Sequence, residues 1–155
     1  MNLEIERKFL VKILPNNGFE KIHIKQYYLS INEKMVQRLR FFDGEKAIIS
    51  FKENCSGLSR YEFEYEIPLD DAKKMVEIIE PKSIEKIRHI IEHDSMKWEV
   101  DEFLSNNKGL IIAEIELKNE DQDIKLPDWI DCEISNKSKY YNYNLALNPY
   151  NFWKE

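Results

Sequence analysis

The chain has 155 residues, a net charge of −6, 43% hydrophobic residues and 34% charged residues. This length suits one hydrophobic core, and we expect residues 1–155 to form a single domain. The acidic charge argues against a nucleic-acid or membrane-surface protein, so any polyanion must bind through a local basic site with help from metal ions. No apolar run approaches the ~20 residues that span a bilayer. With no signal peptide and two widely spaced cysteines, we expect a cytoplasmic protein.

The opening segment, residues 3–11, alternates between apolar and charged side chains. In a strand, successive side chains point to opposite faces, so Glu4, Glu6 and Lys8 share one face and apolar residues share the other. If the apolar face is buried, the charged face looks into solvent or into a polar cavity. The pattern recurs so often along the chain that we favour a cavity.

The same alternation, interrupted by turn-forming residues, predicts a series of short strands. Asp43-Gly44 is the strongest hairpin signal, and Pro68 ends the most regular segment. After the opening strand, the expected strands are residues 21–30, 36–42, 46–52, 60–67, 84–92, 96–103 and 110–118.

Two helices are expected beside these strands. Apolar residues at helical spacing predict one helix that Asp70 or Asp71 caps and that stops before Pro81. The aromatic segment 140–145 predicts a short packing helix. Together the elements indicate an antiparallel β architecture with helical decoration. If the apolar faces pack outward against helices or a partner, the ionic faces line the channel of a barrel that holds a polar ligand.

Three expected strands carry two carboxylates at alternate positions. Such side chains lie roughly 7 Å apart, and at an effective dielectric near 20 their repulsion is roughly 2–3 kcal/mol per pair. One pair alone is usually a solvated strand face, but several facing pairs need cations, for which oxygen-liganded Mg²⁺ or Mn²⁺ is suited. The pairs are Glu4 with Glu6, Glu62 with Glu64, and Glu114 with Glu116.

Basic side chains fall on comparable strand faces. Arginine binds phosphate oxygens bidentately, and lysine adds a compact positive charge. A cavity that combines such bases with paired carboxylates suits a metal-bound polyphosphate. Salt bridges across an exposed sheet are the alternative, but they do not explain why like charges pair along each strand. The bases are Lys8, Arg38, Arg40, Lys52, Arg60, Lys86 and Arg88.

Several short motifs follow one another from the first strand to the closing segment. They are Glu4-Ile5-Glu6-Arg7-Lys8, Arg38-Leu39-Arg40, Lys52, residues 57–67, Glu85-Lys86-Ile87-Arg88, residues 98–103, residues 109–117 and Tyr140-Tyr141-Asn142. The first matches an ExExK signature. Together the motifs resemble the CYTH domain of the triphosphate tunnel metalloenzyme superfamily, in its compact bacterial branch.

The resemblance implies an α+β fold in which an eight-stranded antiparallel β-barrel forms a tunnel with flanking helices. It also implies which inward carboxylates hold Mg²⁺ or Mn²⁺. The expected metal ligands are Glu4, Glu6 and Glu116, with Glu114, Glu62, Glu64 and Asp101 as further candidates for a second ion or for supporting contacts.

The resemblance assigns the phosphate ligands as well. They are Lys8, Arg38, Arg40, Lys52, Lys86 and Arg88, and Arg60 joins them as a base at a strand start. Some thiamine-triphosphatase relatives are thought to use a tyrosine–lysine pair at the leaving group, for which Tyr28 and Lys52 are the candidates. The expected catalytic residues are therefore Glu4, Glu6, Lys8, Lys52 and Tyr28.

The resemblance implies metal-dependent hydrolysis of a small-molecule triphosphate, with inorganic tripolyphosphate as the expected substrate. The alternatives are a class IV-type adenylate cyclase, a thiamine triphosphatase, and a polyphosphate-binding module without turnover. We expect no nucleic-acid or membrane partner. The outward aromatic residues Tyr61, Phe63 and Tyr65 leave open whether helices cover them or a second subunit does in a homodimer.

Overall fold

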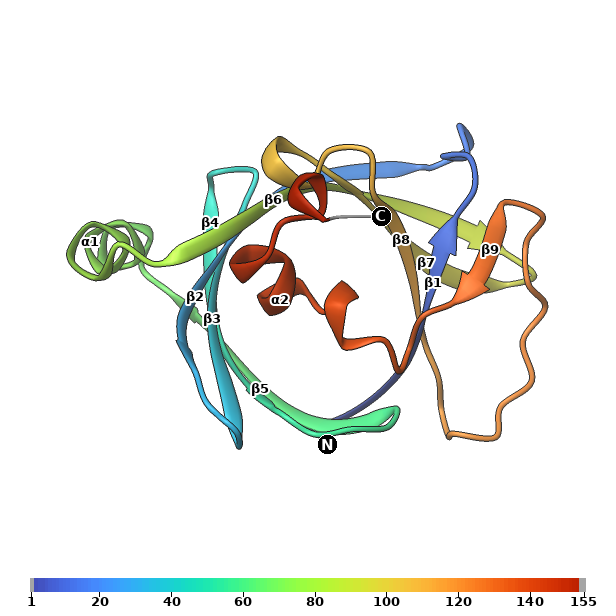
Figure 1. Cartoon of the computed structure of the whole chain (residues 1–155), viewed down its shortest axis with the longest axis horizontal. Coiled ribbons are helices and arrows are strands. Elements are labelled where there is room, and N and C mark those ends of the chain that lie inside the picture. Colours follow the sequence, from blue (N-terminus) through green and yellow to red (C-terminus); the bar gives the residue numbers. More distant parts are fainter. Residues whose placement is uncertain (1, 154–155) are drawn as a thin grey trace.

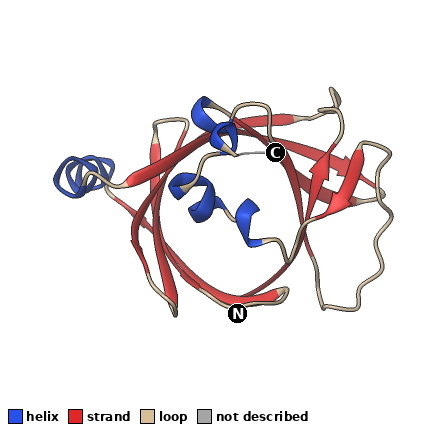
Figure 2. Ribbon diagram, in the orientation of Figure 1, coloured by secondary structure: helices blue, strands red, loops and turns tan. Residues whose placement is uncertain are grey.

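In the computed structural model, which describes residues 2–153, eight antiparallel strands close into a barrel (Figures 1 and 2). The barrel strands are β1 (Leu3–Val11), β2 (Glu20–Ile31), β3 (Met35–Phe42), β4 (Lys46–Glu53), β5 (Ser59–Ile67), β6 (Lys82–His93), β7 (Met96–Phe103) and β8 (Ile111–Glu116). Around the barrel they follow the order β1-β5-β4-β3-β2-β6-β7-β8 and return to β1. The predicted eight-stranded barrel with flanking helices is confirmed.

A ninth strand, β9 (Ile130–Glu133), lies outside the barrel and was not predicted. It pairs with the end of β1, where Phe9 faces Glu133 and Val11 faces Ile130. Four residues after a proline-containing loop give too little alternation to identify a strand from sequence.

Within the barrel, the first strand pairs with two neighbours, β5 and β8. Near its start it pairs with β5 at only three positions, among them Glu4 opposite Arg60. From Glu6 onward it pairs with β8, and Glu6 lies directly opposite Glu116. The Glu4–Glu6 pair therefore lies at the point where β1 changes partner, and this seam completes the barrel.

Helix α1 (Leu69–Ile79) packs against the outside of the barrel (Figure 1). Its Ala72 is fully buried beside Leu39 and Ala47 of β3 and β4. The predicted aspartate cap was wrong, because Pro68 occupies the N-cap position and no side chain caps the helix. Asp70 and Asp71 lie in its first turn, where acidic residues favour the helix dipole.

The C-terminal segment closes one end of the barrel. It contains the short helices η2 (Ser138–Tyr140), α2 (Asn142–Leu147) and η3 (Tyr150–Phe152), which lie across the barrel opening in Figure 1. Leu145 of α2 is fully buried in a cluster with inward-facing Phe103 and Tyr28. The predicted packing helix is confirmed, displaced by two residues toward the C-terminus.

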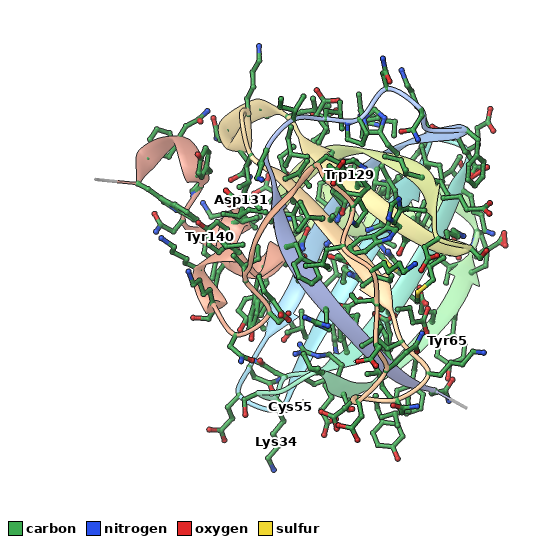
Figure 3. The ribbon with its side chains drawn as sticks, turned by 90° about the vertical axis from the view of Figure 1, so that its right-hand side faces the viewer. Lys34, Cys55, Tyr65, Trp129, Asp131 and Tyr140 are labelled. Carbon is green, nitrogen blue, oxygen red and sulfur yellow. The ribbon has the colours of Figure 1, made fainter. Side chains whose placement is uncertain are left out.

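The outward apolar faces are covered unevenly. On the β1, β7 and β8 side, Trp98 packs edge-on against Trp129 of the loop before β9. On β5, Tyr61 and Tyr65 remain 51% and 57% exposed, and Figure 3 shows Tyr65 on the outside. In residues 2–153 no helix is long and apolar enough to cross a membrane.

Candidate active site

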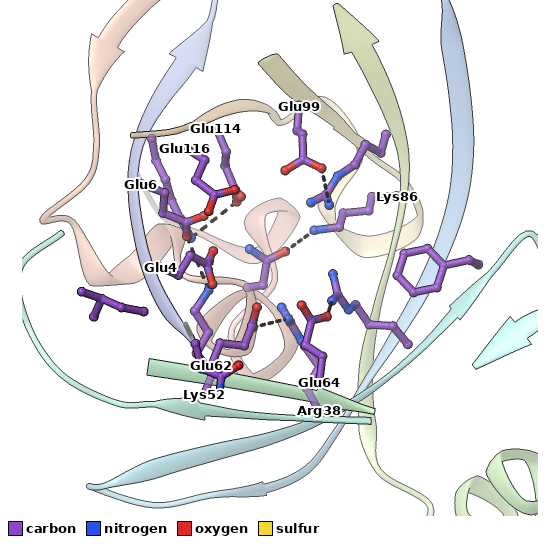
Figure 4. A pocket seen from close by; sticks show the side chains of 17 residues that line it. Glu4, Glu6, Arg38, Lys52, Glu62, Glu64, Lys86, Glu99, Glu114 and Glu116 are labelled. Carbon is purple, nitrogen blue, oxygen red and sulfur yellow. Dashed lines mark hydrogen bonds and ion pairs between the residues drawn. The ribbon is translucent and has the colours of Figure 1, made fainter. Parts of the chain in front are cut away.

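A cavity of about 390 Å³ lies inside the barrel, and charged side chains dominate its wall (Figure 4). Seven strands contribute to it because their inward faces carry the alternating charges. The lining residues are Asn2, Leu3, Glu4, Glu6, Lys8, Arg38, Arg40, Phe42, Lys52, Glu62, Glu64, Lys86, Arg88, Glu99, Glu114, Glu116 and Asn142. The wall thus brings seven carboxylates and six bases together, including every predicted site residue except Tyr28, Arg60 and Asp101.

Carboxylates and lysines alternate on the β1 and β8 wall. The Lys8 Nζ lies 3.8 Å from Glu6 Oε1 and 3.6 Å from Glu114 Oε1. The Lys52 Nζ, from β4, lies 3.7 Å from Glu4 Oε1 and 3.4 Å from Glu6 Oε1. The positive charges of these two ammonium groups therefore offset the repulsion between neighbouring carboxylates.

The Glu4 carboxylate lacks sufficient positive charge around it. Burial, only partly offset by Lys52, raises the pKa of Glu4 to about 9. Its Oε2 atom is buried without a hydrogen-bond partner. Burial also opposes ionisation of Glu6, but Lys52 and Lys8 together outweigh it and hold the Glu6 pKa below its usual range. Glu4 therefore keeps its proton near neutral pH, while the neighbouring Glu6 is ionised.

These groups fit a hard divalent cation in kind. Glu4, Glu6, Glu114 and Glu116 supply only oxygen donors, as Mg²⁺ and Mn²⁺ prefer, and Glu4 Oε2 is an unused donor. The four carboxylates do not form a metal site in this structure, because within residues 2–153 no three acidic, histidine or cysteine side chains converge closely enough to hold an ion. Lys8 and Lys52 lie between them, so a cation must replace these contacts.

On the opposite wall, arginines of β3 pair with glutamates of β5. Arg38 donates to Glu62 Oε2 at 2.7 Å and to Ser50 Oγ at 3.0 Å, and Arg40 donates to Glu64 Oε2 at 2.5 Å. Burial opposes ionisation of Glu62, but Arg38 and Lys52 lower its pKa to about 2. Glu62 and Glu64 therefore serve as partners of guanidinium groups.

Asp101 lies behind the wall rather than on it. It is 1% exposed; its Oδ1 accepts a hydrogen bond from Arg88 Nε at 2.8 Å and its Oδ2 accepts one from Arg88 Nη2 at 2.9 Å. Lys86 Nζ lies 2.8 Å from the same Oδ2. Both Asp101 oxygens therefore contact bases that point toward the cavity, and Asp101 itself does not line it. Burial lowers the pKa of Lys86 to about 8 despite this partner.

Tyr28 and Arg60 border a smaller adjoining cavity, which shares Lys8, Arg38, Lys52 and Asn142 with the main one. The Tyr28 hydroxyl accepts a hydrogen bond from the Gln26 amide, and burial raises the Tyr28 pKa. In the described chain no hydrogen bond joins Tyr28 to Lys52. Arg60 donates to the Gly57 carbonyl at 3.2 Å.

Five lining residues were not predicted as site residues, namely Asn2, Leu3, Phe42, Glu99 and Asn142, and two of these, Glu99 and Asn142, bond to bases of the wall. Glu99 shares a strand face with Asp101, and the alternation within residues 96–103 was sufficient to find it. Glu99 accepts a hydrogen bond from Arg88 Nη1 at 3.1 Å. Asn142 reaches the cavity only because the C-terminal segment folds back over the barrel, and no periodic pattern signals such a contact.

Comparison with known proteins agrees with this geometry. The CYTH domain model matches residues 2–145. A protein of Acetivibrio thermocellus named inorganic triphosphatase is 40% identical over 157 aligned residues, covering all of both chains. A protein of the same name from Nitrosomonas europaea is 29% identical, covering 93% of this chain and 97% of its own.

A solved structure has the same fold. The crystal structure of the inorganic triphosphatase NE1496 superimposes with a TM-score of 0.69 at 27% identity, covering 92% of this chain and 97% of that one. The family match, the full-length relative and the charged cavity inside an eight-stranded barrel agree with one another. The chain belongs to the CYTH family.

Proposed function

We propose that the protein hydrolyses inorganic triphosphate in a metal-dependent reaction inside the barrel. The observation that carries the proposal is the cavity wall, where six bases and seven carboxylates face one space inside the barrel. Two relatives named inorganic triphosphatase support it, one of them 40% identical over the whole chain. CYTH triphosphatases are in general metal-dependent.

The ion pairs in the cavity suggest how substrate and metal enter together. A polyphosphate binds to the bases of the cavity, each of which already forms an ion pair with a carboxylate. Every base that binds phosphate instead leaves one carboxylate without its partner. The freed carboxylates then need cations, because buried unpaired charges are costly. The exchangeable pairs are Lys8 with Glu6 and Glu114, Lys52 with Glu4 and Glu6, Arg38 with Glu62, Arg40 with Glu64, and Arg88 with Glu99.

The residue roles combine this exchange with the family resemblance. Glu4, Glu6 and Glu116 would hold Mg²⁺ or Mn²⁺, as the resemblance implies, with Glu114, Glu62 and Glu64 available for supporting contacts or a second ion. When bound, such an ion polarises the phosphoryl oxygens and offsets their negative charge. The phosphate chain binds along Lys8, Arg38, Arg40, Lys52, Lys86 and Arg88, and a cavity glutamate outside the metal site orients the attacking water. Positioning and electrostatics supply most of the catalysis in phosphoryl transfer.

The wall favours an inorganic substrate over a nucleotide or a thiamine ester. Phe42 is the single aromatic residue among the described residues that line the main cavity, and the adjoining cavity beside Tyr28, Tyr141 and Tyr143 measures only about 40 Å³. A base or a thiazolium ring needs apolar or stacking contacts, whereas phosphate oxygens need the bases present.

The test is phosphate release from tripolyphosphate, ATP and thiamine triphosphate, each with Mg²⁺, Mn²⁺ or a chelator. We expect rapid metal-dependent release from tripolyphosphate, little from the other two, and none with chelator. Cyclic AMP formed from ATP without release from tripolyphosphate would make the protein a cyclase. Tight tripolyphosphate binding with no product in either assay would leave a binding module.

A further inference from the structure

The C-terminal segment reaches the cavity through Asn142, the first residue of α2. Its side-chain Oδ1 accepts a hydrogen bond from Lys86 Nζ at 2.9 Å. Lys86 comes from β6, 56 residues earlier, and points from the wall into the cavity (Figure 4). This contact links the segment that closes the barrel to a side chain of the proposed phosphate site.

The surroundings of Lys86 make this contact consequential. The Lys86 ammonium group has three N–H donors. Asn142 Oδ1 accepts one of them, and Asp101 Oδ2 forms an ion pair with Lys86 Nζ at 2.8 Å. Lys86 is only 1% exposed, so these two partners determine where the third donor points. Asn142 helps to orient Lys86 through a neutral acceptor, so it adds no negative charge to a cavity that must bind a polyanion.

The segment that carries Asn142 is firmly anchored. Leu145, one turn further along α2, is fully buried within the barrel end. The adjacent Tyr141 ring lies 5.6 Å from Lys8 Nζ and 5.8 Å from the Arg60 guanidinium, which is within range of a cation–π interaction. The segment thus contacts a second base of the cavity.

We propose that Asn142 is a positioning residue for triphosphate binding, which orients Lys86 so that its remaining N–H donates to a phosphate oxygen. The C-terminal segment therefore completes the phosphate-binding wall as well as closing the barrel. This inference rests on the proposed function for its substrate, and on the Asn142–Lys86 contact for its geometry.

A double-mutant cycle tests it with Asn142→Ala, Lys86→Met and the two combined. Because Asn142 orients Lys86 and does not itself contact the phosphate, its loss costs about as much binding free energy as one net hydrogen bond. Asn142→Ala is therefore expected to raise the KM for tripolyphosphate roughly three- to ten-fold, with kcat changed less than about two-fold. If Asn142 acts through Lys86, adding Asn142→Ala to Lys86→Met changes KM by less than about 1.5-fold. Full additivity of the two effects would overturn the inference.

Asn144→Ala is the matched control, because the Asn144 amide donates to the Ser138 carbonyl at 2.8 Å and holds the same segment without lining the cavity. We expect its KM to equal that of the unaltered protein. An increase as large as that of Asn142→Ala would assign the effect to loosening of the segment and overturn the inference.

A binding measurement separates this inference from the proposed function. Calorimetry with Mg²⁺ and a nitrogen-bridged tripolyphosphate analogue, which resists hydrolysis, gives Kd without turnover. If the unaltered protein releases no phosphate but Asn142→Ala weakens analogue binding through Lys86, the function fails and the inference stands. If Asn142→Ala changes neither KM nor Kd, the inference fails and the function stands.

Discussion

Glu6→Gln is expected to abolish metal-dependent phosphate release from tripolyphosphate while the barrel stays folded. Glu6 lies opposite Glu116, beside Glu4, and within 3.4 Å of Lys52 and 3.8 Å of Lys8. Glutamine keeps the shape but removes the charge that would hold the cation. Because a bound metal ion supplies several kcal/mol of transition-state stabilisation, we expect kcat/KM to fall at least about 1,000-fold.

The measurement is steady-state phosphate release over a range of Mg²⁺ concentrations, with the melting temperature recorded alongside. Glu92→Gln is the control, since Glu92 is exposed on β6 and lies outside the cavity; its activity should stay within about two-fold of the unaltered protein, as for most surface substitutions. Unchanged activity in both Glu6→Gln and Glu116→Gln would refute the proposed metal site.

Asp101→Asn is expected to affect stability first. Asp101 is the buried anion between Arg88 and Lys86, and its burial is offset by both bases, which hold its pKa below the usual range. Removing one partner of a buried ion pair leaves uncompensated charge and typically costs about 3–5 kcal/mol. We therefore expect the free energy of unfolding in urea to fall by about this amount, with a raised KM in the fraction that remains folded.

The matched control is Asp131→Asn, on the exposed side of β9. It should change the free energy of unfolding by no more than about 0.5 kcal/mol. If Asp101→Asn unfolded at the same urea concentration as the unaltered protein yet required more Mg²⁺ for activity, Asp101 would be a metal ligand, as the family resemblance first implied.

The barrel was predictable because charged and apolar side chains alternate with unusual regularity along its strands. On β5, Glu62 and Glu64 face the cavity while Tyr61 and Tyr65 face outward, as strict alternation requires. The same period located most of the cavity wall, and the motif order identified the CYTH family. The agreement extends to the names of the curated relatives, which match the predicted triphosphatase activity.

What alternation could not predict is how side chains of one face divide their roles. Asp101 and Glu99 lie on the same face of β7, yet Asp101 is sealed behind Arg88 and Lys86 while Glu99 reaches the cavity. Arg60 faces a neighbouring space because it lies beyond the wall, next to Tyr141. Such differences depend on depth within the barrel and on the folded C-terminal segment, neither of which a local period encodes.

The short seam between β1 and β5 has a thermodynamic consequence. Three register pairs, from Leu3 opposite Tyr61 to Ile5 opposite Ser59, complete the circle there; Glu4 lies in the middle pair and Glu6 directly follows the last one. A ligand that contacts β1 on one side of the cavity and β3 to β5 on the other binds only when the barrel is closed. Its binding free energy therefore adds to the cost of opening the seam. A bound ligand therefore stabilises the closed barrel against separation of β1 from β5. Without a ligand, we expect the barrel to open first at this seam, beside its own proposed metal ligands.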